Sequence, residues 1–208
     1  MKQKLFTKNS FIVLFVISSL ISCMGSNAVS DLNAVNSSTG IVQGVVKNNI
    51  MVWEDIPYAL PPEGLLRWKA PRKFTDETAV IFSKEGNGCL QESSIYAGIS
   101  GDGIVGQEDC LYLDIQAPEN FMNNSLPVMF WIHGGGNTTG VKDYYDFSEL
   151  IRRHEVLVVT INYRLGPMGW FTHPAIQDLQ EGLDKTSNFG TLDIIEALHW
   201  VQKNISRF

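Results

Sequence analysis

A run of apolar residues that ends in three glycines most constrains how this chain of 208 residues can fold. Residues 128–132 are all apolar, which suits a strand buried on both faces of a parallel sheet, because a surface strand would alternate apolar and polar residues. Gly134, Gly135 and Gly136 then remove three side chains in a row. Without Cβ atoms the backbone there can adopt positive φ and bring its N–H groups close to a ligand.

The turn after the strand has the composition of an oxyanion hole. The amides of Gly135 and Gly136 are the candidate donors, and each such donor contributes about 3 kcal/mol to the stabilisation of a tetrahedral intermediate. The alternative is that three glycines form only a flexible turn. We interpret His133 as a residue that orients this loop through a hydrogen bond, rather than as a general base.

Five segments, taken together, resemble the amino-terminal portion of the type-B carboxylesterase and cholinesterase-like family. They are DIPYALPPEGLLRWKAP, EDCLYLDI, PVMFWIHGGG, VVTINYRLGPMGW and SNFGTLDIIEALHWVQKNISRF, at 55–71, 108–115, 127–136, 158–170 and 187–208. They follow the family's order and cover nearly everything after Gly40. The resemblance implies an α/β-hydrolase fold, here the amino-terminal part of its central, mostly parallel sheet.

The resemblance also implies the chemistry of an exported serine esterase that acts on small carboxylic esters through an acyl-enzyme. The family's nucleophile elbow, G-x-S-x-G, does not occur in the 208 residues, and its acid and catalytic His lie further on. We therefore expect the chain to be a fragment, inactive alone, that leaves the edges of strands such as 156–161 unpaired. The competing hypotheses are a non-catalytic adhesion or recognition domain of the same fold, and a genuine short product.

Composition excludes other classes of function. With 44% hydrophobic and 18% charged residues, the chain is typical of a globular protein. The formal net charge of −6, without a cluster of Lys or Arg, argues against a nucleic-acid partner. The sequence shows no metal-ligand spacing of cysteines and no phosphate-binding loop, so we expect neither a metal nor a cofactor.

The amino terminus reads as a targeting segment. Three lysines among the first eight residues precede the apolar run at 11–22, which is short for a membrane span but typical of a signal peptide. We assign 1–22 to the signal peptide, 23–39 to a polar tether and 40–208 to the partial esterase domain.

The end of the signal segment resembles a bacterial lipobox. Leu-Ile-Ser-Cys at 20–23 would make Cys23 the lipidated first residue of a cell-envelope lipoprotein, with membrane contact only through that lipid. The alternative is ordinary cleavage near Ala28, which would give a periplasmic or secreted protein.

Cys89 and Cys110 remain as a pair once Cys23 is set aside. In an exported chain two such cysteines form a disulfide more often than two free thiols, and the resemblance implies that they close the family's first loop. In the cholinesterase branch this loop carries a Trp that binds a quaternary ammonium. Here residues 90–109 contain no Trp and Tyr96 is their one aromatic residue, so we expect that choline esters are not substrates.

Two structural ion pairs also follow from the resemblance, and neither is expected to be catalytic. The positions of Arg67 and Glu108 match one structural salt bridge of the family, and the positions of Arg164 and Asp193 match another.

Periodicity and turn residues give the remaining elements. We expect strands within 40–58, 110–116, 128–132 and 155–162, helices at 144–153 and 191–205, and a loop at 178–188.

Overall fold

The structure is a computed structural model that describes residues 33–82, 87–121 and 125–208. The signal segment, the lipobox with Cys23 and most of the expected tether lie outside the described residues. Among the helices of the described ranges, none is long and apolar enough to cross a membrane.

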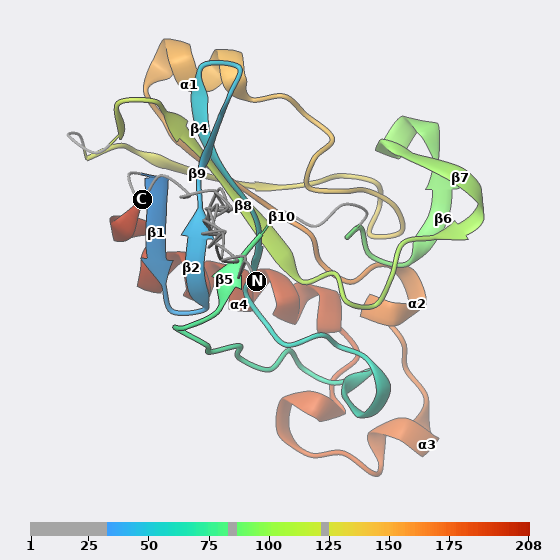
Figure 1. Cartoon of the computed structure of the whole chain (residues 1–208). Helices are drawn as coiled ribbons and strands as arrows, with labels where there is room; N and C mark the ends of the chain where they lie inside the picture. Colours follow the sequence, from blue (N-terminus) through green and yellow to red (C-terminus); the bar gives the residue numbers. More distant parts are fainter. Residues whose placement is uncertain (1–32, 83–86, 122–124) are drawn as a thin grey trace, which may run out of the picture.

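A five-stranded mixed sheet forms the centre of the fold (Figure 1). In spatial order its strands are β3 (Val45–Lys47), β4 (Ile50–Pro57), β8 (Tyr112–Pro118), β10 (Leu157–Ile161) and β9 (Val128–Ile132). Neighbouring strands are antiparallel except for β9 and β10, which pair in parallel. The described part of the sheet is therefore mixed, with parallel pairing between β9 and β10. Of the antiparallel pairs, β3 and β4 form a hairpin, whereas β4 with β8 and β8 with β10 pair across long stretches of the chain.

Two smaller sheets flank the central one. β1 (Ala34–Ser37), β2 (Gly40–Gln43) and β5 (Val80–Ile81) form the first, and β6 (Gln91–Ser94) and β7 (Ile99–Val105) form the second. β1 corrects the predicted tether. Its residues are paired with β2 rather than free, so the ordered domain begins by Ala34 and not at Gly40.

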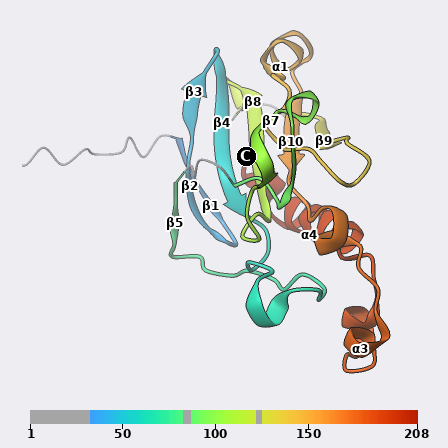
Figure 2. The ribbon, with the colours of Figure 1, turned by 90° about the vertical axis from the view of Figure 1, so that its right-hand side faces the viewer.

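Two helices cover opposite faces of the central sheet, α1 (Ser148–His154) on one side and α4 (Phe189–Asn204) on the other (Figures 1 and 2). Alternation along β4 explains why both faces need a cover. Ile50 and Val52 pack in the α1 cluster, whereas Met51 and Trp53 pack in the main core with α4. Successive side chains of a strand point to opposite faces, so β4, in the interior of the sheet, is covered on both sides.

The remaining helical segments are short. They are α2 (Gly166–Gly169), α3 (Pro174–Gln177) and the 3-10 turns η2 (Gly64–Leu66), η3 (Ile95–Ala97), η5 (Gly182–Lys185) and η6 (Ile205–Arg207). η5 interrupts the segment 178–188 that we expected to be a plain loop.

Helix α1 begins at Ser148, four residues later than predicted. The Asp146 carboxylate accepts a hydrogen bond from the Ser148 amide at 2.8 Å, a local contact that starts the helix there. The preceding residues instead form part of a pocket described below.

The edges of the central sheet differ from expectation. β10 is not an edge strand, because β8 pairs with one side of it and β9 with the other. β9 was predicted to be buried on both faces, yet it lies at the edge of the sheet as the structure describes it. Val128, Met129 and Ile132 are 41%, 45% and 44% exposed.

A disulfide joins Cys89 to Cys110, with the Cα atoms 5.0 Å apart. The loop that it closes contains the β6–β7 hairpin, which the sequence patterns did not reveal. Both cysteines belong to the main core cluster, so the disulfide ties the base of this hairpin to the central sheet.

Replacing both cysteines by alanine should lower the free energy of unfolding by about 3 kcal/mol, because the separation of 21 residues sets the loop entropy returned to the unfolded chain. Urea denaturation measures the difference. A reductant should produce a similar loss in the wild type and none in the double variant. Equal stability of the two proteins under oxidising conditions would contradict the prediction.

Candidate active site

The glycine turn follows β9 directly and has a backbone that only glycine accepts readily. Gly135 has φ +107° and Gly136 has φ +63°. The amides of Thr138 and Thr139 both donate to the Gly135 carbonyl, at 3.1 and 3.2 Å, which closes a tight turn. A Cβ atom at Gly135 would overlap the carbonyl of Thr139, so the turn requires glycine for both its φ and its space.

The amides of Gly135 and Gly136 donate to no protein acceptor within the described part of the chain. No heavy atom would lie within 4 Å of a Cβ atom at Gly134 or Gly136, so the turn borders open space. The Asn137 carbonyl accepts from the Gly166 amide at 2.7 Å and fastens the turn to the start of α2. Two unpaired donors on an anchored backbone are what an oxyanion site needs.

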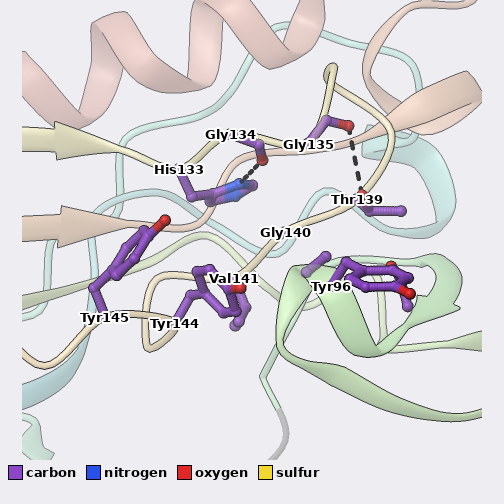
Figure 3. A pocket seen from close by; sticks show the side chains of 11 residues that line it. Tyr96, His133, Gly134, Gly135, Thr139, Gly140, Val141, Tyr144 and Tyr145 are labelled. Atoms are coloured by element: carbon purple, nitrogen blue, oxygen red, sulfur yellow. Dashed lines mark hydrogen bonds between the residues drawn. The ribbon is translucent and has the colours of Figure 1, made fainter.

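A pocket of about 270 Å³ lies against this turn. Figure 3 shows His133 and the glycines on one side of it and Tyr96, Tyr144 and Tyr145 on the other. The lining includes no Asp, Glu, Lys or Arg side chain. The pocket therefore suits an uncharged ligand with apolar or aromatic groups.

Two loops supply the tyrosine side of the pocket. Tyr96 comes from the disulfide loop, whereas Tyr144 and Tyr145 come from the connection between β9 and α1. The Tyr144 ring lies directly over Gly98, where any side chain would overlap it. The Tyr145 ring packs edge-on against Trp131 of β9, with centroids 5.3 Å apart.

His133 is 4% exposed and orients the turn. Its Nδ1 donates to the Gly134 carbonyl at 2.9 Å, and its ring stacks on Tyr163 at 4.3 Å between centroids. The Tyr163 hydroxyl donates in turn to the His133 carbonyl at 2.8 Å. Nε2 of His133 is buried and has no hydrogen-bond partner among the described residues. This geometry suits the loop-orienting role that the sequence suggested.

Burial lowers the pKa of His133 below the usual 6.5, because the charged imidazolium loses its hydration there. We therefore expect a neutral ring at pH 7. The neutral state stabilises the fold above pH 6.5, and this contribution is lost as pH falls from 6.5 through the folded-state pKa. An NMR titration of the His133 ring protons should give a midpoint below 6.5, and a midpoint at or above 6.5 would contradict the assignment.

Arg164 and Asp193 form a buried ion pair behind the turn. Arg164 donates from Nη2 and Nε to the two carboxylate oxygens at 2.7 and 2.8 Å, and its backbone amide donates to the same carboxylate at 3.1 Å. The side chains are 3% and 0% exposed. Arg164 Nη1 also donates to the Lys69 carbonyl at 2.8 Å, so one side chain joins three separate segments.

Arg67 and Glu108 form the second ion pair, 2.6 Å apart at the protein surface. The Arg67 side chain is 41% exposed, and its hydrogen bond to Glu108 raises the pKa of the guanidinium further. Neither ion pair touches the pocket lining, which fits the structural role that the resemblance implied.

Sequence reasoning missed a buried charge in the loop that carries Tyr144 and Tyr145. Lys142 is 2% exposed and contacts the carboxylates of Asp55, Asp114 and Asp143. In the sequence it stands in VKDYYD, which has the composition of a solvated loop. No local pattern distinguishes it from a surface lysine, because its partners Asp55 and Asp114 are distant in the chain.

Within the described residues, no group of three or more His, Cys, Asp or Glu side chains could hold a metal ion.

Known proteins resemble the chain in both sequence and fold. The carboxylesterase family profile matches residues 31–208. The para-nitrobenzyl esterase of Bacillus subtilis (strain 168) is 40% identical over 177 residues, and the fumonisin B1 esterase of Sphingopyxis macrogoltabida is 37% identical over 188. These alignments cover 84% and 83% of this chain but 35% and 32% of the relatives, so the chain spans about a third of their length.

Solved structures agree. A thermophilic para-nitrobenzyl esterase superposes with a TM-score of 0.73 at 38% identity, over 85% of this chain and 36% of its own. A carboxylesterase of Geobacillus stearothermophilus superposes with a TM-score of 0.72 at 32% identity, and the match covers 85% of this chain and 35% of the esterase chain. With its α/β-hydrolase fold and its matching sequence, the chain belongs to the carboxylesterase family.

Proposed function

We propose that the chain provides the oxyanion half of the active site of an exported carboxylic ester hydrolase. The observation that carries the proposal is the pair of unpaired amides at Gly135 and Gly136, on an anchored turn beside a pocket. Two such donors stabilise the negative oxygen that forms when a serine attacks an ester carbonyl.

The pocket supports an uncharged ester as substrate. Its tyrosine side offers ring faces and hydroxyl groups, and no lining side chain carries a formal charge. The names of two relatives, para-nitrobenzyl esterase and fumonisin B1 esterase, refer to esters of organic molecules.

The covalent step requires a nucleophile, an acid and a catalytic histidine, and this chain contains no motif that would supply the nucleophile. The 208 residues contain no G-x-S-x-G elbow, so we propose that a serine, an acid and a histidine outside them complete the site. The proposal predicts that the 208-residue chain hydrolyses p-nitrophenyl butyrate at the background rate.

The reading frame beyond the codon for Phe208 provides the test. A following strand with an elbow that contains Ser, and labelling of that Ser by a fluorophosphonate probe, would support the hydrolase. An elbow without Ser would instead support a recognition domain of the same fold. Hydrolysis by the 208-residue chain that the probe abolishes would show that its own residues supply the nucleophile, contrary to the proposal.

We further propose that Cys23 anchors the protein in a bacterial cell envelope. The lipobox at 20–23 supports this proposal, as does the disulfide, because disulfides persist in oxidising compartments. Metabolic labelling with a fatty-acid analogue should tag the wild type and not Cys23→Ser. A soluble product cleaved near Ala28 would exclude the anchor.

A further inference from the structure

Lys142 is the centre of a buried charge cluster beside the pocket. Its Nζ lies 2.8 Å from Asp114 Oδ2, 2.9 Å from Asp55 Oδ1 and 2.9 Å from Asp143 Oδ1. Asp55 and Asp114 are as buried as the lysine, whereas Asp143 reaches solvent. Burial acts to lower the pKa of Lys142, but the surrounding carboxylates outweigh it and hold the pKa above its usual value, so the lysine remains charged.

The backbone of Lys142 is held as firmly as its side chain. The Lys142 amide donates to Asn162 Oδ1 at 2.8 Å, and Asn162 Nδ2 donates to the Asn87 carbonyl at 3.1 Å. Asn87 donates to Asp55, and the Asp55 amide donates to Asp114 Oδ1 at 2.8 Å. The network thus forms a closed ring that joins β4, β8, the residue after β10 and the segment just before Cys89.

The fold places Asp55 in this network by distorting β4. The register of β4 against β8 shifts between Trp53 and Ile56, and Asp55 lies in that irregularity with φ +58°. A non-glycine residue in this conformation is unfavourable by about 1 kcal/mol or more, and such bulges characteristically redirect a side chain. The distortion therefore points to a specific task for the cluster.

That task concerns the loop between β9 and α1, which carries both the glycine turn and two of the three tyrosines of the pocket, Tyr144 and Tyr145. Gln91 holds the loop at Gly140, accepting from its amide at 2.7 Å and donating to its carbonyl at 3.0 Å. Lys142 holds it two residues later. Tyr144 and Tyr145 follow directly, so their position relative to the glycine turn depends on where residue 142 is fixed.

We infer that Lys142 is a positioning residue: its ion pairs with Asp55 and Asp114 fix Tyr144 and Tyr145 opposite the glycine turn. The importance of this role for catalysis rests on the proposed function, in which the tyrosines hold the uncharged ester. The anchoring of the loop by Lys142 does not depend on hydrolysis and can be tested without a substrate.

Hydrogen exchange of the full chain gives that test. In Lys142→Met we expect the amides of residues 137–146 to exchange about tenfold faster or more, while α4 keeps its protection, because the loop loses its anchor and the sheet does not. Lys47→Met is the matched control, since that lysine forms an ion pair on the surface and is 52% exposed. An unchanged loop in Lys142→Met, or a loop and α4 that lose protection in equal measure, would overturn the inference.

A triple variant separates positioning from the cost of stranded charges. Lys142→Met combined with Asp55→Asn and Asp114→Asn leaves no buried charge among these three residues, and replacing a whole buried cluster is often neutral for stability. We expect the loop amides to exchange as fast in this triple variant as in Lys142→Met, because a methionine side chain cannot link the loop to β4 and β8. Recovery of wild-type protection in the loop would show that Lys142 only neutralises the charge of the two carboxylates, and the inference would then be wrong. Neither result depends on ester hydrolysis, so failure of the proposed function would be recognised separately.

Discussion

Replacing Asp193 by alanine should lower the free energy of unfolding by about 3–5 kcal/mol, because the variant leaves the Arg164 guanidinium buried without its counter-charge. Both side chains are almost fully excluded from solvent, and Asp193 accepts three hydrogen bonds from Arg164. The loss is a large part of the total stability of a typical domain, so much of the variant should be unfolded in mild urea.

Urea denaturation followed by circular dichroism measures this loss. Glu149→Ala is the matched control: its carboxylate pairs with Arg152 and Arg153 on the surface of α1, and it is 57% exposed. We expect that control to change stability by about 0.5 kcal/mol or less. Similar losses in the two variants would show that the Arg164–Asp193 pair contributes no more than a surface pair.

Gly135→Ala should reduce the turnover of an ester by about 100- to 1000-fold in the catalytically complete protein that the proposed function requires, the usual effect of losing one oxyanion donor. The added Cβ would overlap the Thr139 carbonyl, and φ at Gly135 lies where an L residue is strained. The turn must therefore reorganise, and its amides can no longer point together at the substrate oxygen.

Initial rates with p-nitrophenyl butyrate should show the effect in kcat more than in KM, since an oxyanion donor acts mainly in the transition state. Gly182→Ala is the control, because Gly182 also has positive φ, +56°, but its Cβ would meet no heavy atom within 4 Å and it lies outside the pocket lining. Equal losses of kcat in the two variants would attribute the effect to backbone strain in general.

Local patterns in the sequence were sufficient for the elements that surround the turn. The apolar run at 128–132 forms β9, the apolar positions from Leu192 to Val201 lie in α4, and the three glycines form the tight turn. Each of these depends on residues close together in the chain, which is the information that periodicity and glycine content carry.

The strand pairing could not be predicted in the same way. β4 pairs with β8 across about 60 residues, and a run of apolar residues does not specify the direction of its neighbour. The expectation of parallel pairing, drawn from the apolar run at 128–132, is confirmed for β9 and β10, which are connected through α1.

β1 and the residues after it were mistaken for a tether because they are polar. Ser38 and Thr39 are nevertheless buried. The Ser38 amide donates to Asn204 at 2.8 Å, and Trp200 donates to the Thr39 hydroxyl at 3.0 Å. These partners lie in α4, more than 160 residues away, and composition alone cannot distinguish a hydroxyl with such a partner from a solvated one.

In the 208-residue chain, the open edge of β9 should also affect production in cells. In the part of the chain that the structure describes, β9 pairs only with β10, and Val128, Met129 and Ile132 stay close to half exposed beside its free edge. An apolar edge of this kind pairs readily with a strand of another molecule, which leads to aggregation. The yield of monomer should therefore fall as expression level rises, and slow synthesis at low temperature should recover it.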